Sequence, residues 1–143
     1  MNNFKQFELP LYNIKSKKYS ICQISIHKND RGRLILDFEH DLLEKQQTQS
    51  SDFFACLCEL RLVLEKYGYL ILCNGARVDC YPSGMGINMG LGLQVYQLKL
   101  GEKANRHDLV KTFNIAEVSQ VGTVEEQRTY FEKFLESHGW SKE

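Results

Sequence analysis

The sequence predicts an α+β fold, in which an antiparallel sheet of about four to five strands carries two helices packed on it. Apolar residues alternate with a period of two in several short runs, and they recur at helical spacing in two longer runs. These runs follow one another in the order strand, strand, helix, strand, strand, helix. A chain of 143 residues with 43% hydrophobic residues fits one domain over residues 1–143.

The first forty residues contain a predicted hairpin. Residues 19–26 alternate cleanly and predict a strand, and residues 33–39 predict its partner. The turn at 28–32 contains Asn, Asp and Gly, which tolerate the left-handed backbone of tight turns. Residues 1–15 predict an edge strand or an arm across the sheet, because Pro10 disfavours a central strand.

The first predicted helix covers about residues 51–67 and ends at Gly68. The glutamine-rich residues 44–51 before it predict a loop or the weak start of the helix. Three residues can cap its free amides, namely Ser50, Ser51 and Asp52. Helical spacing predicts a buried stripe of Phe53, Leu57, Leu60, Leu64 and Tyr67. Four charged residues are assigned to the opposite side, namely Glu59, Arg61, Glu65 and Lys66.

The second half of the chain contains further predicted strands and the last predicted helix. Residues 69–73 form a short apolar run that predicts a central strand, and residues 93–100 alternate as a further strand. Residues 110–118 predict a short strand or a turn. Thr123 and Glu126 form a capping box at the start of the last helix. Its amphipathic stripe contains Gln127, Tyr130, Phe131, Phe134, Leu135 and His138.

The most informative segment is the long loop predicted at residues 73–92, which contains five of the ten glycines. Loops of this length in a small domain are usually functional or disordered, and its apolar residues argue against disorder. We therefore interpret it as an ordered surface for a binding partner. Its predicted partner-binding residues are Asn74, Arg77, Asp79, Tyr81, Ser83, Met85 and Asn88. In an equally supported structural alternative, Arg77 and Asp79 pair with each other or with framework groups and hold the loop shut.

Composition and motif spacing argue against several function classes. Lysine plus arginine and aspartate plus glutamate are balanced at 18 each, which disfavours a nucleic-acid partner. The chain shows no membrane-spanning run and no signal peptide, so we expect a cytoplasmic protein. The glycines lack the spacing of a nucleotide-binding loop, and we expect no cofactor. Because zero net charge lowers self-repulsion, a homodimer is an open alternative.

The cysteines and histidines give no strong catalytic or metal motif. An odd count of five cysteines without an export signal predicts reduced thiols, and Cys22, Cys56 and Cys73 lie in apolar runs that predict packing. Cys80 is a candidate nucleophile and His107 a candidate base, although nothing in the sequence brings them together. We therefore predict no catalytic residues and no metal site.

Two stretches carry a resemblance to a known class of bacterial proteins. Residues 72–85 read LCNGARVDCYPSGM and residues 121–127 read VGTVEEQ. Together they resemble small bacterial immunity proteins of polymorphic toxin and contact-dependent growth inhibition systems, over about residues 53–136. The resemblance implies a cytosolic protein that binds a cognate toxin domain and neutralises it. It does not cover the first fifty residues, where a partner-specific surface is also compatible with the sequence.

Two function classes follow from the sequence. The first is a stoichiometric inhibitor, a protein-binding module without turnover. The second is a small-molecule-binding domain or enzyme that uses the loop at 73–92 as a lid, with Asn74, Arg77, Asp79 or Cys80 lining the pocket. The position of the loop distinguishes them: a deep pocket with convergent polar groups favours the second class, and a flat face favours the first.

Overall fold

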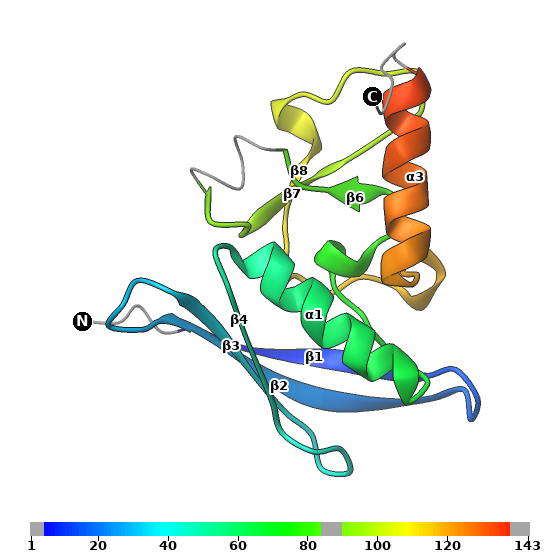
Figure 1. The fold of residues 1–143 in the computed structure, drawn as a ribbon. Coiled ribbons are helices and arrows are strands. Elements are labelled where there is room, and N and C mark those ends of the chain that lie inside the picture. Colours follow the sequence, from blue (N-terminus) through cyan, green and yellow to red (C-terminus); the bar gives the residue numbers. More distant parts are fainter. Residues whose placement is uncertain (1–4, 84–89, 138–143) are drawn as a thin grey trace.

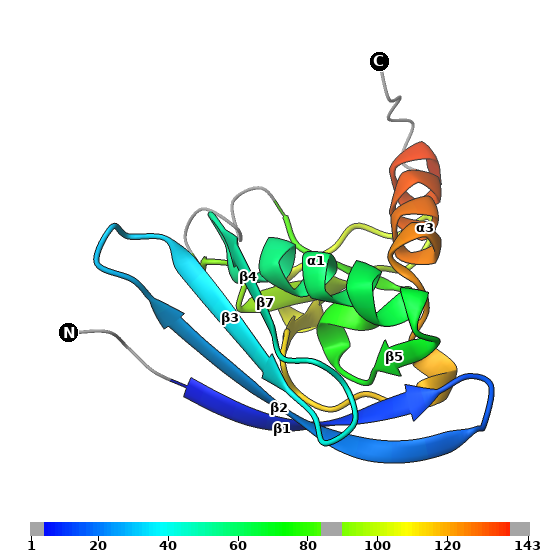
Figure 2. The ribbon, with the colours of Figure 1, turned by 60° about the horizontal axis from the view of Figure 1, so that its bottom comes forward.

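The computed structural model describes residues 5–83 and 90–137 and confirms the α+β fold. Its larger sheet is antiparallel throughout and has the strand order β4-β3-β2-β1-β5. This sheet curls around helix α1 (Figure 2). The five strands are β1 (Lys5–Asn13), β2 (Lys18–Lys28), β3 (Leu34–Glu39), β4 (Gln46–Ser50) and β5 (Tyr69–Ile71).

The second half of the chain forms a smaller antiparallel sheet of order β6-β7-β8, which the sequence did not separate from the first. Figure 1 shows this sheet on the other side of α1 from the large sheet, with α3 standing beside β6. The three strands are β6 (Cys80–Tyr81), β7 (Gln94–Gln97) and β8 (Leu109–Lys111). The helices are α1 (Phe53–Lys66), α3 (Val124–Ser137) and the short 3₁₀ turns η1 (Asn74–Ala76), η2 (Arg106–Asp108) and η3 (Val118–Gln120).

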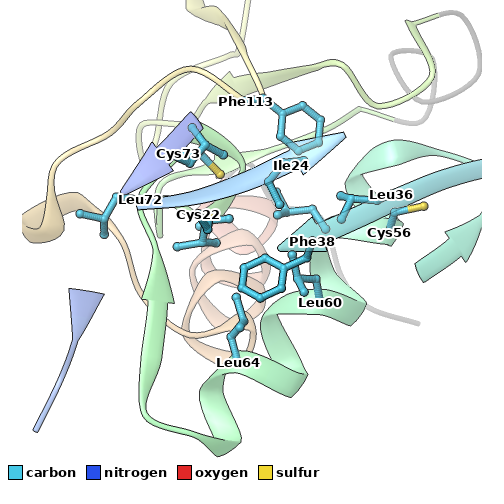
Figure 3. Close-up of a cluster of buried hydrophobic side chains, with 14 of the residues drawn as sticks. Cys22, Ile24, Leu36, Phe38, Cys56, Leu60, Leu64, Leu72, Cys73 and Phe113 are labelled. Atoms are coloured by element: carbon cyan, nitrogen blue, oxygen red, sulfur yellow. The ribbon is translucent and has the colours of Figure 1, made fainter. Parts of the chain in front are cut away.

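The core lies between α1 and the inner face of the large sheet. Figure 3 shows Phe38 close to Leu60 and Leu64 of α1, and these three side chains are almost fully buried. The predicted packing of Cys22, Cys56 and Cys73 is confirmed, because each thiol lies inside this cluster. Burial of such apolar side chains supplies most of the free energy of folding.

Helix α1 confirms the predicted helix, and Asp52 is its N-cap, whose side chain accepts a hydrogen bond from the Ala55 amide. Gly68 follows the helix at a φ of +81°, as a helix-ending glycine requires. Two assignments of individual residues were wrong. Tyr67 is 63% exposed because the helix ends before it, and Arg61 is only 2% exposed. Arg61 is buried because the second side of α1 also packs against protein.

Strand β1 is an internal strand, so the predicted edge position was wrong. Pro10 faces Ile21 of β2 across the ladder, and its carbonyl accepts a hydrogen bond from the Leu72 amide. In a strand the N–H and C=O of one residue point to the same side, so the proline nitrogen points away from β2. The pairing of β1 with β5 begins only at Leu11. A proline therefore costs this strand no ladder hydrogen bond.

Two further local expectations are corrected by the sheet order. The segment at 44–51 is neither a loop nor the start of a helix, because Gln46–Ser50 form edge strand β4. Its polar side chains find tertiary partners: Gln47 donates to Asp37 at 2.7 Å, and Thr48 donates to the Cys56 carbonyl at 2.9 Å. Strand β5 lies at the opposite edge of the sheet, so its predicted central position was also wrong.

Helix α3 confirms the predicted capping box. The Thr123 amide donates to Glu126 Oε1 at 2.8 Å, and the Glu126 amide donates to Thr123 Oγ1 at 3.1 Å. Glu65 of α1 accepts a hydrogen bond from the Val124 amide at 2.9 Å, which joins the start of α3 to α1. His138, the last residue of the predicted stripe, lies outside the described residues.

Candidate functional site

The first part of the predicted loop is folded and packed. Residues 74–76 form the turn η1, residues 80–81 form strand β6, and Gly75, Ala76 and Cys80 are buried. A backbone hydrogen bond from the Val78 amide to the Gln120 carbonyl ties the segment to the chain before α3. We refer to residues 74–81 as the anchored segment.

The anchored segment is held by a buried cation that the sequence analysis assigned to the surface. Arg61 lies on the second side of α1, in line with Phe54 and Cys58 at spacings of four and three residues. Its guanidinium donates to the carbonyls of Gly75 at 3.3 Å and Gly122 at 3.0 Å. One guanidinium thus joins α1 to the anchored segment and to the residues that precede α3.

Gln127 of α3 completes this network. Its side-chain oxygen accepts a hydrogen bond from Arg61 at 2.6 Å, and the side chain is 1% exposed. Its amide nitrogen lies 2.8–2.9 Å from three backbone carbonyls of the anchored segment, those of Gly75, Arg77 and Cys80. The amide therefore supplies hydrogen bonds to carbonyls that no sheet ladder satisfies.

The positive charge of Arg61 has no carboxylate partner within residues 5–83 and 90–137. Carbonyl oxygens and the Gln127 amide oxygen carry the compensating negative partial charge instead. Because a buried charge without partners costs several kcal/mol, each of these acceptors is needed to keep the Arg61 guanidinium buried in the folded protein. We infer that the anchored segment has one arrangement relative to α1 and α3.

Arg77 and Asp79 form the ion pair that the structural alternative predicted. Arg77 donates to both carboxylate oxygens of Asp79 at 2.9 Å, and Gln97 donates to the same carboxylate at 3.3 Å. These hydrogen bonds from the guanidinium to Asp79 raise the pKa of Arg77. The Arg77 side chain is 12% exposed and that of Asp79 28%. The pair therefore stiffens the segment and presents only part of its surface to solvent.

The other predicted site residues are distributed differently. Asn74 is 9% exposed and donates to the Lys111 carbonyl at 3.0 Å, so it holds the small sheet in place. Tyr81 is half-buried, with its ring stacked on Phe131 of α3 at 4.1 Å between centroids. Ser83 is half-buried at the end of the first described range. Two further predictions, Met85 and Asn88, lie outside the described residues.

A shallow groove runs between the anchored segment and α3. It has a volume of about 350 Å³. Val78 of the anchored segment forms one side, and Tyr130 forms part of the other, where its hydroxyl donates to the Leu98 carbonyl at 2.9 Å. The remaining lining residues are exposed on α3, namely Glu125, Glu126, Thr129 and Lys133. Sequence reasoning missed the groove, because only the tertiary placement of residue 78 beside α3 creates it.

The structure does not make Cys80 a nucleophile. Burial raises the pKa of Cys80 to about 12, and the neighbouring Asp79 carboxylate also acts in that direction. The thiolate is the reactive form of cysteine, so this thiol is inert at neutral pH. His107, the candidate base, is exposed in η2. Among the described residues, no group of three or more histidine, cysteine, aspartate or glutamate side chains could hold a metal ion.

Comparisons with known proteins give no family for this chain. No protein-family model matches the sequence, and no curated protein matches it. Within the described part of the chain, no helix has both the length and the apolar composition needed to cross a lipid bilayer.

Proposed function

We propose that this protein is an immunity-type inhibitor, which binds a cognate toxin domain and neutralises it without catalysis. The binding surface in this proposal is the groove between Val78 and α3, together with the exposed part of the Arg77–Asp79 pair. The immunity role is what the sequence resemblance implies, and the geometry of the groove supports this choice of surface.

The observation that carries the proposal is the rigid anchoring of residues 74–81. Arg61 and Gln127 bind backbone carbonyls of the segment, and the Arg77–Asp79 ion pair links two side chains within it. A surface that is already ordered loses little conformational entropy on binding, which favours affinity. Such an arrangement suits a stoichiometric inhibitor, whose function is complete once the complex has formed.

The shape of the groove also supports protein binding over the lid hypothesis. The groove is shallow, and its lining consists of one apolar side chain, a tyrosine, a threonine and three charged residues of α3. Asn74, Arg77, Asp79 and Cys80 do not line it, although the lid hypothesis places them in a pocket. Their polar groups bond to the protein itself, so they do not converge on a ligand.

A matched pair of charge reversals tests the proposal. We expect Lys133→Glu, in the groove, to weaken binding of the proposed toxin partner by about tenfold, because charges at an interface steer the encounter and fix the orientation of the partner. Any toxin domain encoded in a neighbouring gene is the candidate partner for this measurement. Lys15→Glu makes the same charge change in the exposed β1–β2 turn and is expected to leave affinity unchanged. Biolayer interferometry with the full chain measures both.

Two outcomes of this experiment contradict the proposal. If Lys15→Glu weakens binding and Lys133→Glu does not, the interface lies on the N-terminal hairpin. If neither wild type nor variants bind the toxin domain at micromolar concentration, the immunity role itself is wrong. Thermal unfolding of both variants controls for loss of the fold, since both lysines are exposed.

A further inference from the structure

A second groove lies on the molecule where the start of β1 meets the small sheet. Its volume is about 360 Å³, and it is separate in its lining residues from the groove beside α3. It is formed by the beginning of β1, the start of β7 with the residues that lead into it, and the end of β8 with the chain that follows. Its lining residues include Lys5, Phe7, Leu93, Gln94, Lys111, Phe113 and Asn114.

Two phenylalanines form an aromatic wall of this groove. The rings of Phe7 and Phe113 stack with centroids 5.1 Å apart and planes inclined by 22°. Phe113 is 3% exposed and anchored in the core, whereas Phe7 is half-buried and leaves part of its ring accessible. Leu93, also half-buried, extends the apolar surface. Aromatic walls of this kind favour flat apolar groups, which pack against ring faces and edges.

The charged residues at the rim of the groove are all positive. Lys5 and Lys111 both line it and are both exposed, and no acidic residue is among its lining residues. Within the described ranges, neither lysine takes part in an ion pair. The side chains of Gln94 and Asn114 add amide donors beside the two ammonium groups. Among the described lining residues, an anion placed here meets donors and cations and no carboxylate.

The wall that carries Lys111 and Phe113 is fixed by hydrogen bonds. Thr112 donates from its hydroxyl to the Gly92 carbonyl at 2.7 Å and is itself fully buried. The side-chain amide of Asn74 donates to the Lys111 carbonyl at 3.0 Å, and the backbone amide of Asn74 donates to the Asn114 carbonyl at 2.9 Å. The groove is therefore largely formed before any ligand arrives, as small-molecule sites usually are.

We propose that this groove binds a small organic anion with an aromatic body, of the arylalkyl carboxylate class. The aromatic body packs against Phe7 and Leu93, and the buried Phe113 supports the Phe7 ring by stacking on it. The carboxylate lies at the rim between Lys5 and Lys111. A volume of about 360 Å³ is at the lower end of the roughly 300–1,000 Å³ found for ligand pockets, which suits a ligand of this size. This site is independent of the toxin-binding surface.

The test compares 3-phenylpropionate with its uncharged analogue 3-phenylpropionamide, which has the same aromatic body. Titration of the ¹⁵N-labelled full chain is followed in ¹H–¹⁵N spectra. We expect the carboxylate to shift the backbone signals of Gln94, Lys111 and Asn114, and to bind about tenfold more tightly than the amide, because charge-assisted hydrogen bonds are the stronger ones.

Variants separate the charge contribution from the aromatic contribution. Lys5→Gln with Lys111→Gln is expected to lower affinity for the carboxylate about tenfold and to leave that for the amide unchanged. Phe7→Leu is expected to lower the affinity for both probes, because both contain the same aromatic body. Lys99→Gln with Lys103→Gln removes the same charge from exposed positions outside this lining and is the matched control.

Three results would overturn the proposal. The first is equal affinity for 3-phenylpropionate and 3-phenylpropionamide. The second is an equal loss of carboxylate binding in the two lysine double variants. The third is that millimolar carboxylate causes no chemical-shift changes, or causes them only at residues away from the groove. Each leaves the toxin-binding experiment unaffected, so the two hypotheses fail separately.

Discussion

Replacing Arg61 with methionine is expected to destabilise the protein by roughly 3 kcal/mol. Methionine retains much of the apolar stem but removes every donor of the guanidinium. The carbonyls of Gly75 and Gly122 and the side-chain oxygen of Gln127 then lose a buried hydrogen bond. Urea unfolding followed by circular dichroism measures the change in the free energy of unfolding.

Two comparisons make the Arg61 result specific. Lys66→Met removes a charge from an exposed position on the same helix and is expected to change stability by less than about 0.5 kcal/mol. Gln127→Leu combined with Arg61→Met should cost at least about 1 kcal/mol less than the sum of the single changes, because the two side chains share one network. If the loss of stability in the double variant equals the sum of the two single losses, the two side chains act separately.

Replacing Gly92 with alanine is expected to cost about 2–4 kcal/mol, the second large effect. Gly92 has a φ of +77°, and a Cβ there would lie 2.6 Å from the Phe54 nitrogen and 3.0 Å from the Asp52 carboxylate oxygen. The clash falls on the first turn of α1, where the backbone is fixed by the Asp52 cap. The helix start or the chain at 92 must therefore move.

Gly101 provides the matched control for Gly92. Its φ of +81° is as unfavourable for alanine, but a Cβ there meets nothing within 4 Å. Gly101→Ala should therefore cost only about 1 kcal/mol, the usual penalty for the left-handed backbone. The difference between the two variants in urea unfolding measures the steric contribution alone. An equal decrease in the free energy of unfolding for the two variants would mean that the structure accommodates the Cβ of residue 92 beside α1 without a steric penalty.

The elements specified by local chemistry were predictable from the sequence. The hairpin of β2 and β3, the cap of α1 and the capping box of α3 each depend on residues close together in the chain, and each was confirmed. Period-two alternation in residues 19–26 fixes which face is buried without any knowledge of the rest of the fold.

The sequence analysis missed features that depend on partners distant in the chain. Residues 46–50 are polar, and only hydrogen bonds to Asp37 and Cys56 make them a stable edge strand. Arg61 was assigned to solvent because one apolar stripe was assumed for α1, whereas the helix has protein on two sides. The line of Phe54, Cys58 and Arg61 is a second stripe that signals this burial in the sequence.

The candidate site shows the same division. That Arg77 and Asp79 pair was foreseen as one of two alternatives, because they are two residues apart in a constrained loop. The burial of Asn74 and the groove between Val78 and α3 depend on contacts with residues 111–133, far along the chain. Motif spacing carries no information about such contacts.

Hydrogen exchange of the full chain, alone and with the proposed toxin partner, tests whether the anchored segment is ordered before binding. We expect slow exchange of the Ala76, Arg77 and Val78 amides in the free protein, because their carbonyl partners are already in place. Binding should then add protection along the groove, in residues 123–133. Fast exchange at 76–78 that slows only in the complex would contradict it, as would new protection confined to the β1–β2 hairpin.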